Sequence, residues 1–382
     1  MRPIRVLAVD DSALVRRLLT DALRDEPLLE LVGSAATGRI ALAKLGPLAP
    51  DVVVLDVEMP DLDGLATLVE LRRSHPRLPV VMFSALTERG ALATLDALAA
   101  GATDYVTKPH GTGGAAAAVQ AIRDELVPKL RALGGDPVAA GLSGASGPLP
   151  AHPRLTANGP VDAVVVAVST GGPNALAELV PRLPADLDVP VLVVQHMPPM
   201  FSRLLAERLD AISMLRVAEG IADAVLTPGQ VWIAAGGLHL AVRRDAAELR
   251  GQGLTAASKD GAVRLTTSEG PLVNACRPAA DVLFTAAVEV WGPRLLAVVM
   301  TGMGADGLRG CRAVREAGGQ VVVQDEASSV TWGMPGAVAS AGLADRVLPL
   351  DELAGEIVRR TAIGRPRARA ALLAARSRPV SA

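Results

Sequence analysis

The sequence predicts an α/β protein in which two doubly wound, mostly parallel-sheet domains are joined by a flexible linker. Short apolar runs alternate with helical periods over residues 1–126, lapse over residues 127–160, and resume over residues 161–355. A length of 382 residues also favours more than one domain. Residues 356–382 form a basic C-terminal tail with seven arginines and no acid from Arg359 onward, which we interpret as a solvated end.

The first domain is predicted to contain five strands that alternate with five helices. Its strands are short, mainly aliphatic runs, and its helices repeat apolar residues every three or four positions. Such alternation indicates a parallel sheet with helices on both faces. The predicted strands are residues 4–9, 29–35, 51–56, 79–84 and 104–107, and the predicted helices are residues 12–24, 38–45, 65–73, 89–100 and 115–130.

The second domain follows a segment, GGDPVAAGLSGASGPLPAHPRLTANGP, whose composition is typical of flexible linkers. Beyond it the same alternation returns. The predicted strands are residues 161–168, 189–196, 294–301 and 320–324, and the predicted helices are residues 174–180, 202–209 and 307–317. Residues 230–234 and 238–242 are expected to form a short hairpin around Gly236 and Gly237. The helical segment of residues 243–255 and the following Lys259-Asp260-Gly261 are expected to form an enlarged hairpin, to which we assign no role.

Composition excludes several classes of protein. The net charge of -2 gives no reason to expect a nucleic-acid partner, and no apolar run is long enough for membrane insertion. The N-terminus has a short apolar run followed by two aspartates, which is not a signal peptide. Cys276 and Cys311 are the two cysteines of the sequence, which favours a reducing compartment and a cytoplasmic location.

Polar side chains follow the predicted strands of the first domain where each strand ends. The first strand leads into Asp10 and Asp11, the third ends at Asp56, the fourth ends at Ser84, and Lys108 follows the fifth. Carboxyl ends of parallel strands share one edge of the sheet, so these groups should meet there. Three carboxylates at one edge call for a hard cation such as Mg²⁺. With the metal, Lys108 and Ser84 around it, Asp56 can accept a phosphoryl group.

These residues resemble the receiver domain of two-component response regulators. The matching stretches are VLAVDDSALVRR, VVVLDVEMPDLDG and GATDYVTKP. The resemblance implies that Asp56 is phosphorylated by a histidine kinase. It further implies that Mg²⁺ is bound by Asp11 and Asp56, by Asp10 through water, and by the backbone carbonyl of Glu58. Ser84 and Lys108 are then switch residues, and Tyr105 takes the place of a rotating aromatic side chain.

A second group of reactive residues follows strands of the second domain. Residues 161–168 lead into Ser169-Thr170-Gly171-Gly172, a turn that suits either a phosphate cradle or a nucleophilic serine. A phosphate loop would require a nearby lysine, and none is present. Instead, His196 and Asp306 follow two further strands. We expect Ser169 to attack an acyl carbon, His196 to transfer its proton, and Asp306 to orient the imidazole.

Ser169, His196 and Asp306 are each weak evidence for a hydrolase when taken alone. Their occurrence together at three strand ends is stronger evidence. The TGMGADG loop before and around Asp306 could offer backbone amides to an oxyanion. The chain order Ser, His, Asp differs from that of the α/β-hydrolases, so that fold is not supported.

The second domain resembles the catalytic domain of the protein-glutamate methylesterases of bacterial chemotaxis. The resemblance rests on VSTGGP, VVQHMPPMFSRLLAERL, TGMGADG and QDEASSVTWGMP. It implies a Ser169-His196-Asp306 triad, with Thr170 and the amide of Met303 lining the site. It also implies hydrolysis of glutamate methyl esters, with some glutamine deamidation, on the cytoplasmic domains of methyl-accepting chemoreceptors. We expect the esterase to need no cofactor and the chain to be a monomer.

Two stretches depart from that family pattern. Asn274-Ala275-Cys276-Arg277-Pro278-Ala279-Ala280-Asp281 stands where the family reads closer to His-Arg-Pro-Ser-Val-Asp, a change at the rim of the expected site. Ser328-Ser329 stands where members often carry Cys. Neither stretch includes a residue of the expected triad.

Two alternatives differ in what the second domain does. It could be a receiver-controlled, receptor-binding adaptor with a vestigial hydrolase site, in which case the triad would be dispensable. A DNA-binding response regulator would need a basic recognition helix, and the near-neutral charge argues against one. We favour an esterase that the receiver covers until phosphorylation shifts it toward an open form.

Overall fold

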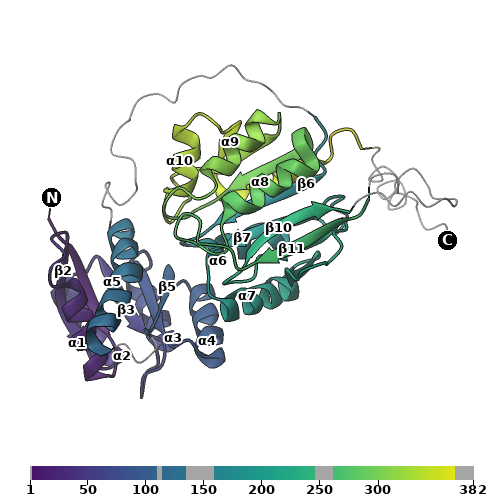
Figure 1. Cartoon of the computed structure of the whole chain (residues 1–382). Helices are drawn as coiled ribbons and strands as arrows, with labels where there is room; N and C mark the ends of the chain where they lie inside the picture. Colours follow the sequence, from purple (N-terminus) through teal and green to yellow (C-terminus); the bar gives the residue numbers. More distant parts are fainter. Residues whose placement is uncertain (1, 110–113, 135–158, 246–260, 366–382) are drawn as a thin grey trace, which may run out of the picture.

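The computed structural model describes residues 2–109, 114–134, 159–245 and 261–365 (Figure 1). Within the first two ranges, five parallel strands form a sheet in the order β2-β1-β3-β4-β5. The strands are β1 (Ile4–Val9), β2 (Leu29–Ala35), β3 (Val52–Asp56), β4 (Val80–Ser84) and β5 (Asp104–Thr107); the helices are α1 (Ala13–Leu23), α2 (Gly38–Leu48), α3 (Gly64–Ser74), α4 (Glu88–Ala99) and α5 (Gly114–Leu133). Every element predicted for this domain is present.

Local sequence explains where these elements begin. All five residues of β3 are buried, because helices cover both faces of a parallel sheet. α1 begins after Ser12, whose hydroxyl accepts a hydrogen bond from the amide of Val15. α3 begins after Asp63, whose carboxylate accepts one from the amide of Ala66. These caps fix the helices that follow β1 and β3, and with them the loops that carry the reactive aspartates.

Across residues 159–245 and 261–365, seven strands form a second sheet in the order β14-β13-β12-β6-β7-β9-β8, and each neighbouring pair is parallel. The strands are β6 (Ala163–Val168), β7 (Val191–Gln195), β8 (Arg216–Glu219), β9 (Gln230–Ile233), β12 (Leu295–Val299), β13 (Gln320–Gln324) and β14 (Arg346–Leu348). Because β6 lies between β7 and β12, the direction of winding reverses there. Ligands of such sheets bind at this reversal point.

Helices cover both faces of the second sheet. α6 (Gly172–Leu179), α7 (Pro199–Ile212) and α11 (Leu350–Thr361) pack on one face, and α8 (Ala280–Trp291), α9 (Leu308–Glu316) and α10 (Met334–Ser340) on the other (Figure 1). An antiparallel pair, β10 (His239–Arg244) and β11 (Val263–Ser268), packs against α8. None of the helices in the described ranges is long and apolar enough to cross a membrane.

The predicted hairpin of residues 230–234 and 238–242 is wrong. β9 is an inner strand of the large sheet, parallel to both β7 and β8, whereas β10 pairs with β11 in a separate sheet. The chain leaves the large sheet at Gly236, where an added Cβ would lie 2.3 Å from the backbone carbon of Pro198. This close packing turns the chain away from β9 instead of back along it. Arg243 and Arg244, expected to be helical, belong to β10, and residues 246–260 lie outside the described residues.

Two predicted domain boundaries also need correction. α5 continues to Leu133, so the first residues of the predicted linker are helical; residues 135–158 lie outside the described residues. α11 continues to Thr361, so the start of the predicted tail belongs to the packed second domain. Arg365 donates hydrogen bonds to the backbone of Asp188 and Val161, and only residues 366–382 lie beyond the described part.

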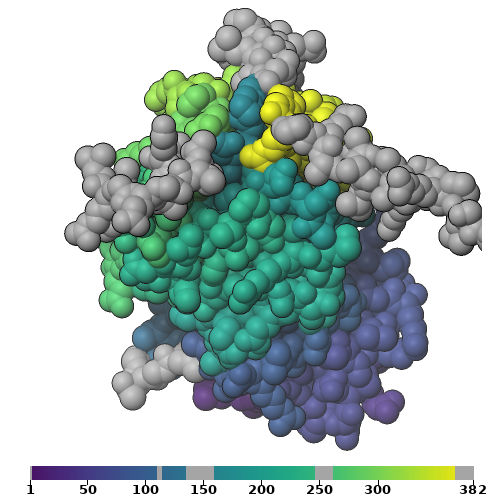
Figure 2. Space-filling model, turned by 90° about the vertical axis from the view of Figure 1, so that its right-hand side faces the viewer, coloured from purple at the N-terminus to yellow at the C-terminus, as the bar shows by residue number. Residues whose placement is uncertain are grey.

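The two domains contact each other through α4 and β5 of the first and through α6 and α7 of the second (Figure 1). Figure 2 shows the teal atoms of the second domain packed directly against the blue atoms of the first. Tyr105 is buried and stacks on Phe201 of α7, with ring centroids 4.6 Å apart. Around this stack, Arg203 pairs with Glu88 at 2.8 Å and Arg208 pairs with Asp96 at 2.7 Å. An aromatic contact flanked by ion pairs therefore joins the domains.

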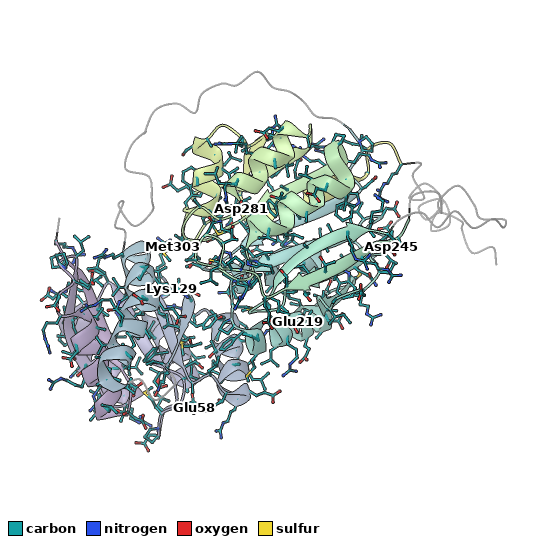
Figure 3. The ribbon with its side chains drawn as sticks, viewed as in Figure 1. Glu58, Lys129, Glu219, Asp245, Asp281 and Met303 are labelled. Carbon is teal, nitrogen blue, oxygen red and sulfur yellow. The ribbon has the colours of Figure 1, made fainter. Side chains whose placement is uncertain are left out.

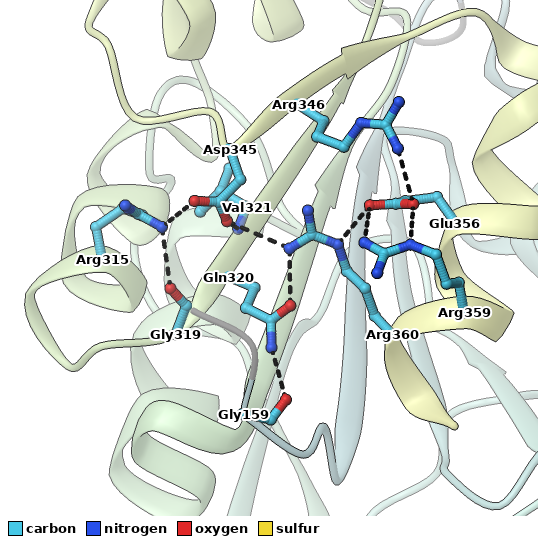
Figure 4. A network of polar contacts seen from close by, with 10 residues as sticks. All are labelled: Gly159, Arg315, Gly319, Gln320, Val321, Asp345, Arg346, Glu356, Arg359 and Arg360. Atoms are coloured by element: carbon cyan, nitrogen blue, oxygen red, sulfur yellow. Dashed lines mark hydrogen bonds and ion pairs between the residues drawn. The ribbon is translucent and has the colours of Figure 1, made fainter. Parts of the chain in front are cut away.

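α11 is held to the large sheet by a polar network (Figure 4). Arg360, only 5% exposed, donates to Glu356 and Gln320, at 2.7 Å each. Glu356 also accepts hydrogen bonds from Arg359. Burial alone would raise the pKa of Glu356, but the hydrogen bonds from Arg359 and Arg360 outweigh it and lower the pKa to about 2. The carboxylate is therefore ionised in the folded protein, and its negative charge balances the positive charges of Arg359 and Arg360.

Replacing Glu356 with Gln should destabilise the second domain by about 3 kcal/mol at pH 7, because Arg360 would keep its buried charge without its partner. The folded-state pKa lies below the ordinary value of 4.5, so the carboxylate's contribution is present above that pH and is lost as pH falls toward 2. Denaturant unfolding should show nearly the same deficit of the variant at pH 7 and pH 5, both above 4.5, and a smaller deficit at pH 4. Glu70→Gln, which breaks an exposed pair with Arg73, should change stability little.

Candidate active site

The carboxyl ends of β1, β3 and β5 bring charged groups together in the first domain. Asp10 and Asp56 are buried, Asp11 is exposed, and one carboxylate oxygen of each lies within 4.8 Å of those of the other two. The Lys108 ammonium lies 2.9 Å from Asp10 Oδ2 and 2.8 Å from Asp56 Oδ1. The sequence-predicted cluster is thus assembled, with a cation at its inner side.

The surroundings of the Asp56 carboxylate suit the binding of a cation or of a phosphoryl group. Burial raises its pKa to about 6; the neighbouring Asp10 carboxylate also raises it, and the hydrogen bond from Lys108 opposes both. Its Oδ1 accepts a hydrogen bond from the amide of Glu58, whereas Oδ2 is buried and has no hydrogen-bond partner among the described residues. An oxygen-rich cluster with an unpartnered buried oxygen fits a hard divalent cation such as Mg²⁺.

Ser84 and Tyr105 have partners other than Asp56 in this structure. The Ser84 hydroxyl donates to the carbonyl of Gly90, at 3.0 Å, and so points toward α4. Tyr105 is turned inward against Phe201, and the Lys129 ammonium lies 5.2 Å from its ring centroid. Both predicted switch residues therefore contact elements of the domain interface.

Ser169 follows β6 directly and stands at the reversal point of the second sheet. Its amide donates to the carbonyl of Thr301, and its carbonyl accepts from the amide of Gly172, which closes a tight turn into α6. Gly171 has φ +74°, a conformation that glycine adopts without strain. Gly302 approaches so closely that an added Cβ would lie 2.9 Å from Ser169 Cβ. The serine is thus held where two glycine-rich turns meet.

His196 and Asp306 form the buried half of a proton relay. Val168 is paired with Gln195 in the register of β6 and β7, so Ser169 and His196 are the next residues on adjacent strands. His196 Nε2 lies 2.8 Å from Asp306 Oδ2. Asp306 follows β12, the neighbour of β6 on its other side. Three residues distant in the sequence thereby reach one edge of the sheet.

The Asp306 carboxylate is held by several donors besides His196. Oδ2 accepts from the amide of Ala280 at 2.6 Å, and Oδ1 accepts from the amides of Asp281 and Gly307. The side chain of Asn274 donates to Oδ1 at 2.7 Å. Burial would raise the pKa of Asp306, but the bond to His196 and the backbone amides outweigh it and lower the pKa. The carboxylate is therefore fixed and charged.

The structure does not join Ser169 to His196. Within the described residues, Ser169 Oγ makes no hydrogen bond, and His196 Nδ1 instead lies 3.6 Å from Cys276 Sγ. Burial alone would lower the pKa of His196, but the bond to Asp306 and the contact with Cys276 raise it to about 9. Because Asp306 holds Nε2, Nδ1 is the nitrogen left to accept a proton from the serine.

Thr170 and Met303 lie in the two turns that meet at the serine, and their role in lining the site stays a prediction. Thr170 is buried, and its carbonyl accepts from Thr301 Oγ1. Met303 follows Gly302 in the turn beside Ser169, and its amide donates to no group in the described part of the chain. In Figure 3, Met303 lies at the edge of the second domain, and Glu58 marks the separate aspartate cluster of the first. A free amide next to the serine suits an oxyanion.

Sequence reasoning gave no role to Asn274, Cys276 or Asp281, although it noted that their segment departs from the expected pattern. Asn274 donates to both Asp281 and Asp306, and Cys276 contacts His196. Asp281 is buried and accepts from Arg309 and from the amide of Gly310. A carboxylate in the first turn of a helix resembles an ordinary helix-capping residue, so spacing alone could not reveal these contacts.

Comparisons with known proteins identify the families of both domains. The CheB methylesterase family matches residues 164–357, and the response regulator receiver domain matches residues 6–120. A protein-glutamate methylesterase/protein-glutamine glutaminase of Trichodesmium erythraeum is 45% identical and spans 94% of this chain and 99% of its own. A protein of the same name from Nocardioides is 48% identical, and the match spans 96% of this chain and 98% of that protein. The catalytic domain of Thermotoga maritima CheB is 36% identical, covers 52% of this chain and 98% of that chain, and has a TM-score of 0.48.

Fold and site together define a hydrolase domain joined to a response-regulator receiver. The chain belongs to the CheB methylesterase family. The two expected domain types are confirmed, and the domain joined to the receiver is a methylesterase domain instead of a DNA-binding one.

The His196 imidazole should titrate at about pH 9 in the full chain, as followed by ¹⁵N NMR of labelled histidine. His196→Gln identifies the resonance. Asp306→Asn should lower this pKa, because burial then acts on the charged ring without the opposing carboxylate. An unchanged titration in Asp306→Asn would contradict the assigned pair.

Proposed function

We propose that this chain hydrolyses methyl esters of glutamate side chains on the cytoplasmic domains of methyl-accepting chemoreceptors, and that phosphorylation of Asp56 activates it. Deamidation of receptor glutamines would use the same site. The observation that carries the proposal is the 2.8 Å bond between His196 and Asp306, beside a serine at the adjacent strand end. Family membership supports the reaction class, and a cytoplasmic setting suits a kinase-driven receiver.

The proposed reaction starts from the neutral His196 ring, the fraction of which grows as the pH rises toward the ring's pKa of about 9. Ser169 Oγ attacks the ester carbonyl carbon while its proton passes to Nδ1 of that neutral ring. The imidazolium, stabilised by Asp306, then protonates the leaving methoxide, and methanol departs. Water repeats the sequence on the acyl-serine and releases glutamate. With glutamine as substrate, ammonia leaves in place of methanol. The ring must first exchange its contact with Cys276 for one with Ser169.

The oxyanion formed on the substrate carbonyl needs donors that are already oriented. We assign this role to the amide of Met303, with Thr170 lining the same side. A single oriented donor of this kind contributes about 3 kcal/mol to the transition state. No step of this reaction calls for a metal or another cofactor in the esterase domain.

The receiver would bind Mg²⁺ through Asp11, Asp56 and the Glu58 carbonyl, with Asp10 acting through water. The metal would neutralise charge on the phosphoryl group that Asp56 takes from a histidine kinase. Lys108 would balance the remaining charge. Ser84 and Tyr105 would then leave their present partners, Gly90 and Phe201, and this change would reach the domain interface.

Receiver docking explains how phosphorylation can control the esterase. Asn174 of α6, five residues beyond Ser169 in the sequence, donates to the carbonyl of Ala102 in the receiver at 3.0 Å. The receiver therefore lies against the helix that starts at the serine. We infer that docking restricts receptor access to Ser169 and that phosphorylation shifts the population toward an undocked form. An adaptor with a vestigial site is less well supported, since His196 and Asp306 retain an intact, ionised pair.

Methanol release from methylated receptor membranes tests the activity and its control together. A small phosphodonor with Mg²⁺ should raise the initial rate by about tenfold. Ser169→Ala should abolish release with or without the donor. Asp56→Asn should retain the basal rate and lose the activation. Equal rates with and without phosphodonor would contradict the control mechanism, and full activity in Ser169→Ala would contradict the assigned nucleophile.

Charge reversal at the interface tests docking separately from phosphorylation. Arg208→Glu should place two like charges opposite each other and raise the basal rate by about two- to fivefold, because surface pairs contribute little each. Adding Asp96→Arg should restore the pair and the low rate. Arg182→Glu, which faces Glu178 within the second domain, is the matched charge control. A basal rate unaffected by Arg208→Glu would argue against an inhibitory contact.

A further inference from the structure

A tight turn connects residues 273 and 276 beside the catalytic pair. The amide of Val273 donates to the carbonyl of Cys276 at 3.1 Å, and the amide of Cys276 donates back at 2.9 Å. The two residues between them, Asn274 and Ala275, have φ values of +53° and +61°. Two successive left-handed residues closed by such a pair of bonds are typical of a type I′ turn.

The conformation of this turn is unfavourable for its sequence. Asn tolerates the left-handed region, but Ala275 carries a Cβ there and would cost on the order of 1–2 kcal/mol. Such backbone strain persists where surrounding contacts hold it, and it is often found at functional sites. The side chains of Asn274 and Cys276 supply contacts of this kind.

Asn274 links two buried carboxylates. Its side-chain amide donates to Asp306 Oδ1 at 2.7 Å and to Asp281 Oδ2 at 2.8 Å. Arg309 of α9 pairs with the same oxygen of Asp281 at 3.0 Å. The neutral amide thus lies between two carboxylates that would otherwise repel each other, and it sets the plane of Asp306.

Cys276 contacts the other end of the relay. Its Sγ lies 3.6 Å from His196 Nδ1, the ring nitrogen that Asp306 does not hold. One short turn therefore contacts both members of the catalytic pair, the carboxylate through Asn274 and the imidazole through Cys276.

We infer that Asn274 and Cys276 are positioning residues for the esterase: Asn274 fixes the Asp306 carboxylate, and Cys276 holds the His196 ring until Ser169 displaces it. The inference rests on the proposed function of the triad. Neither residue needs to touch the substrate. Because one strained turn carries both contacts, movement of residues 274–276 would change the contact with Asp306 and the contact with His196 together.

Charged groups around the relay set the direction of each expected effect. The His196 ring contacts Asp306 and Cys276. Asn274 lies between Asp306 and a second carboxylate, Asp281. The charge of Asp281 is balanced by Arg309. A negative charge added at position 274 should make the imidazolium harder to deprotonate. Removal of the thiol at position 276 should make it easier to deprotonate.

The test is the pH dependence of kcat/KM for methyl ester hydrolysis by the full chain. The acidic limb of this profile is the rise of kcat/KM with pH as His196 loses its proton. Asn274→Asp should move the midpoint of this limb upward by roughly one pH unit, and Cys276→Ala should move it downward by a similar amount. Asn274→Gly keeps a residue suited to positive φ and removes only the amide. It should lower kcat by about tenfold and leave KM unchanged, since one hydrogen bond to a charged group is lost.

Matched controls separate the two side chains from the turn and from general stability. Ala275→Gly relieves the strained position and should raise stability without moving the limb. Cys311→Ala removes the other cysteine, a buried thiol near Asp281 and Asp306 that stays neutral because burial raises its pKa, and should also leave the limb in place. Wild-type limbs in Asn274→Asp and Cys276→Ala, with wild-type kcat in Asn274→Gly, would overturn the inference.

Failure of this inference can be distinguished from failure of the proposed function. If the wild type hydrolyses ester and Ser169→Ala does not, the function stands whatever the turn variants do. The NMR titration of His196 needs no turnover, so it reports the two opposite shifts even in Ser169→Ala. Absence of both shifts there would overturn the positioning role by itself.

Discussion

The hydrogen bond between His196 and Asp306 is the interaction on which the catalytic half of the molecule depends. It joins residues 110 positions apart and holds them at 2.8 Å. It exists because β6 lies between β7 and β12, so that the chain delivers a serine, an imidazole and a carboxylate to one edge. The bond to His196, together with the backbone amides of Ala280 and Asp281, keeps Asp306 ionised despite its burial.

The same constraint shapes the receiver, where parallel strands bring Asp10, Asp56 and Lys108 to one edge. The two edges are connected by the α4 face of the receiver, which packs on α6 and α7. Tyr105 belongs to the receiver's reactive edge and to this interface at once, through its stack on Phe201. A change at Asp56 therefore has a short physical route to α6, the helix that follows Ser169 in the chain.

Sequence patterns were sufficient for the alternation of strands and helices and for the strand ends that carry Asp56, Ser169 and His196, because buried parallel strands are continuous apolar runs. They failed where tertiary packing decided. β9 joined the large sheet between β7 and β8, and the chain leaves that sheet where Gly236 packs closely on Pro198. Arg360 is buried because Glu356 balances its charge and Gln320 accepts a hydrogen bond from it.

The details of the relay were equally beyond sequence reasoning. Asn274 and Cys276 reach the catalytic pair through a turn whose positive φ values no spacing rule predicts. The contact between Cys276 and His196 Nδ1, in place of one from Ser169, depends on side-chain orientation within a buried site. The residue types suggested the three members of the relay. They could not show which ring nitrogen of His196 faces Asp306 and which faces the serine side of the site.

Peptide mapping by mass spectrometry, after acid quench of the full chain turning over a methylated receptor fragment, tests the central claim most directly. Our account predicts a glutamyl adduct on the peptide that contains Ser169, and no adduct on that peptide in Ser169→Ala. An adduct on Cys276, or turnover that persists without Ser169, would contradict it.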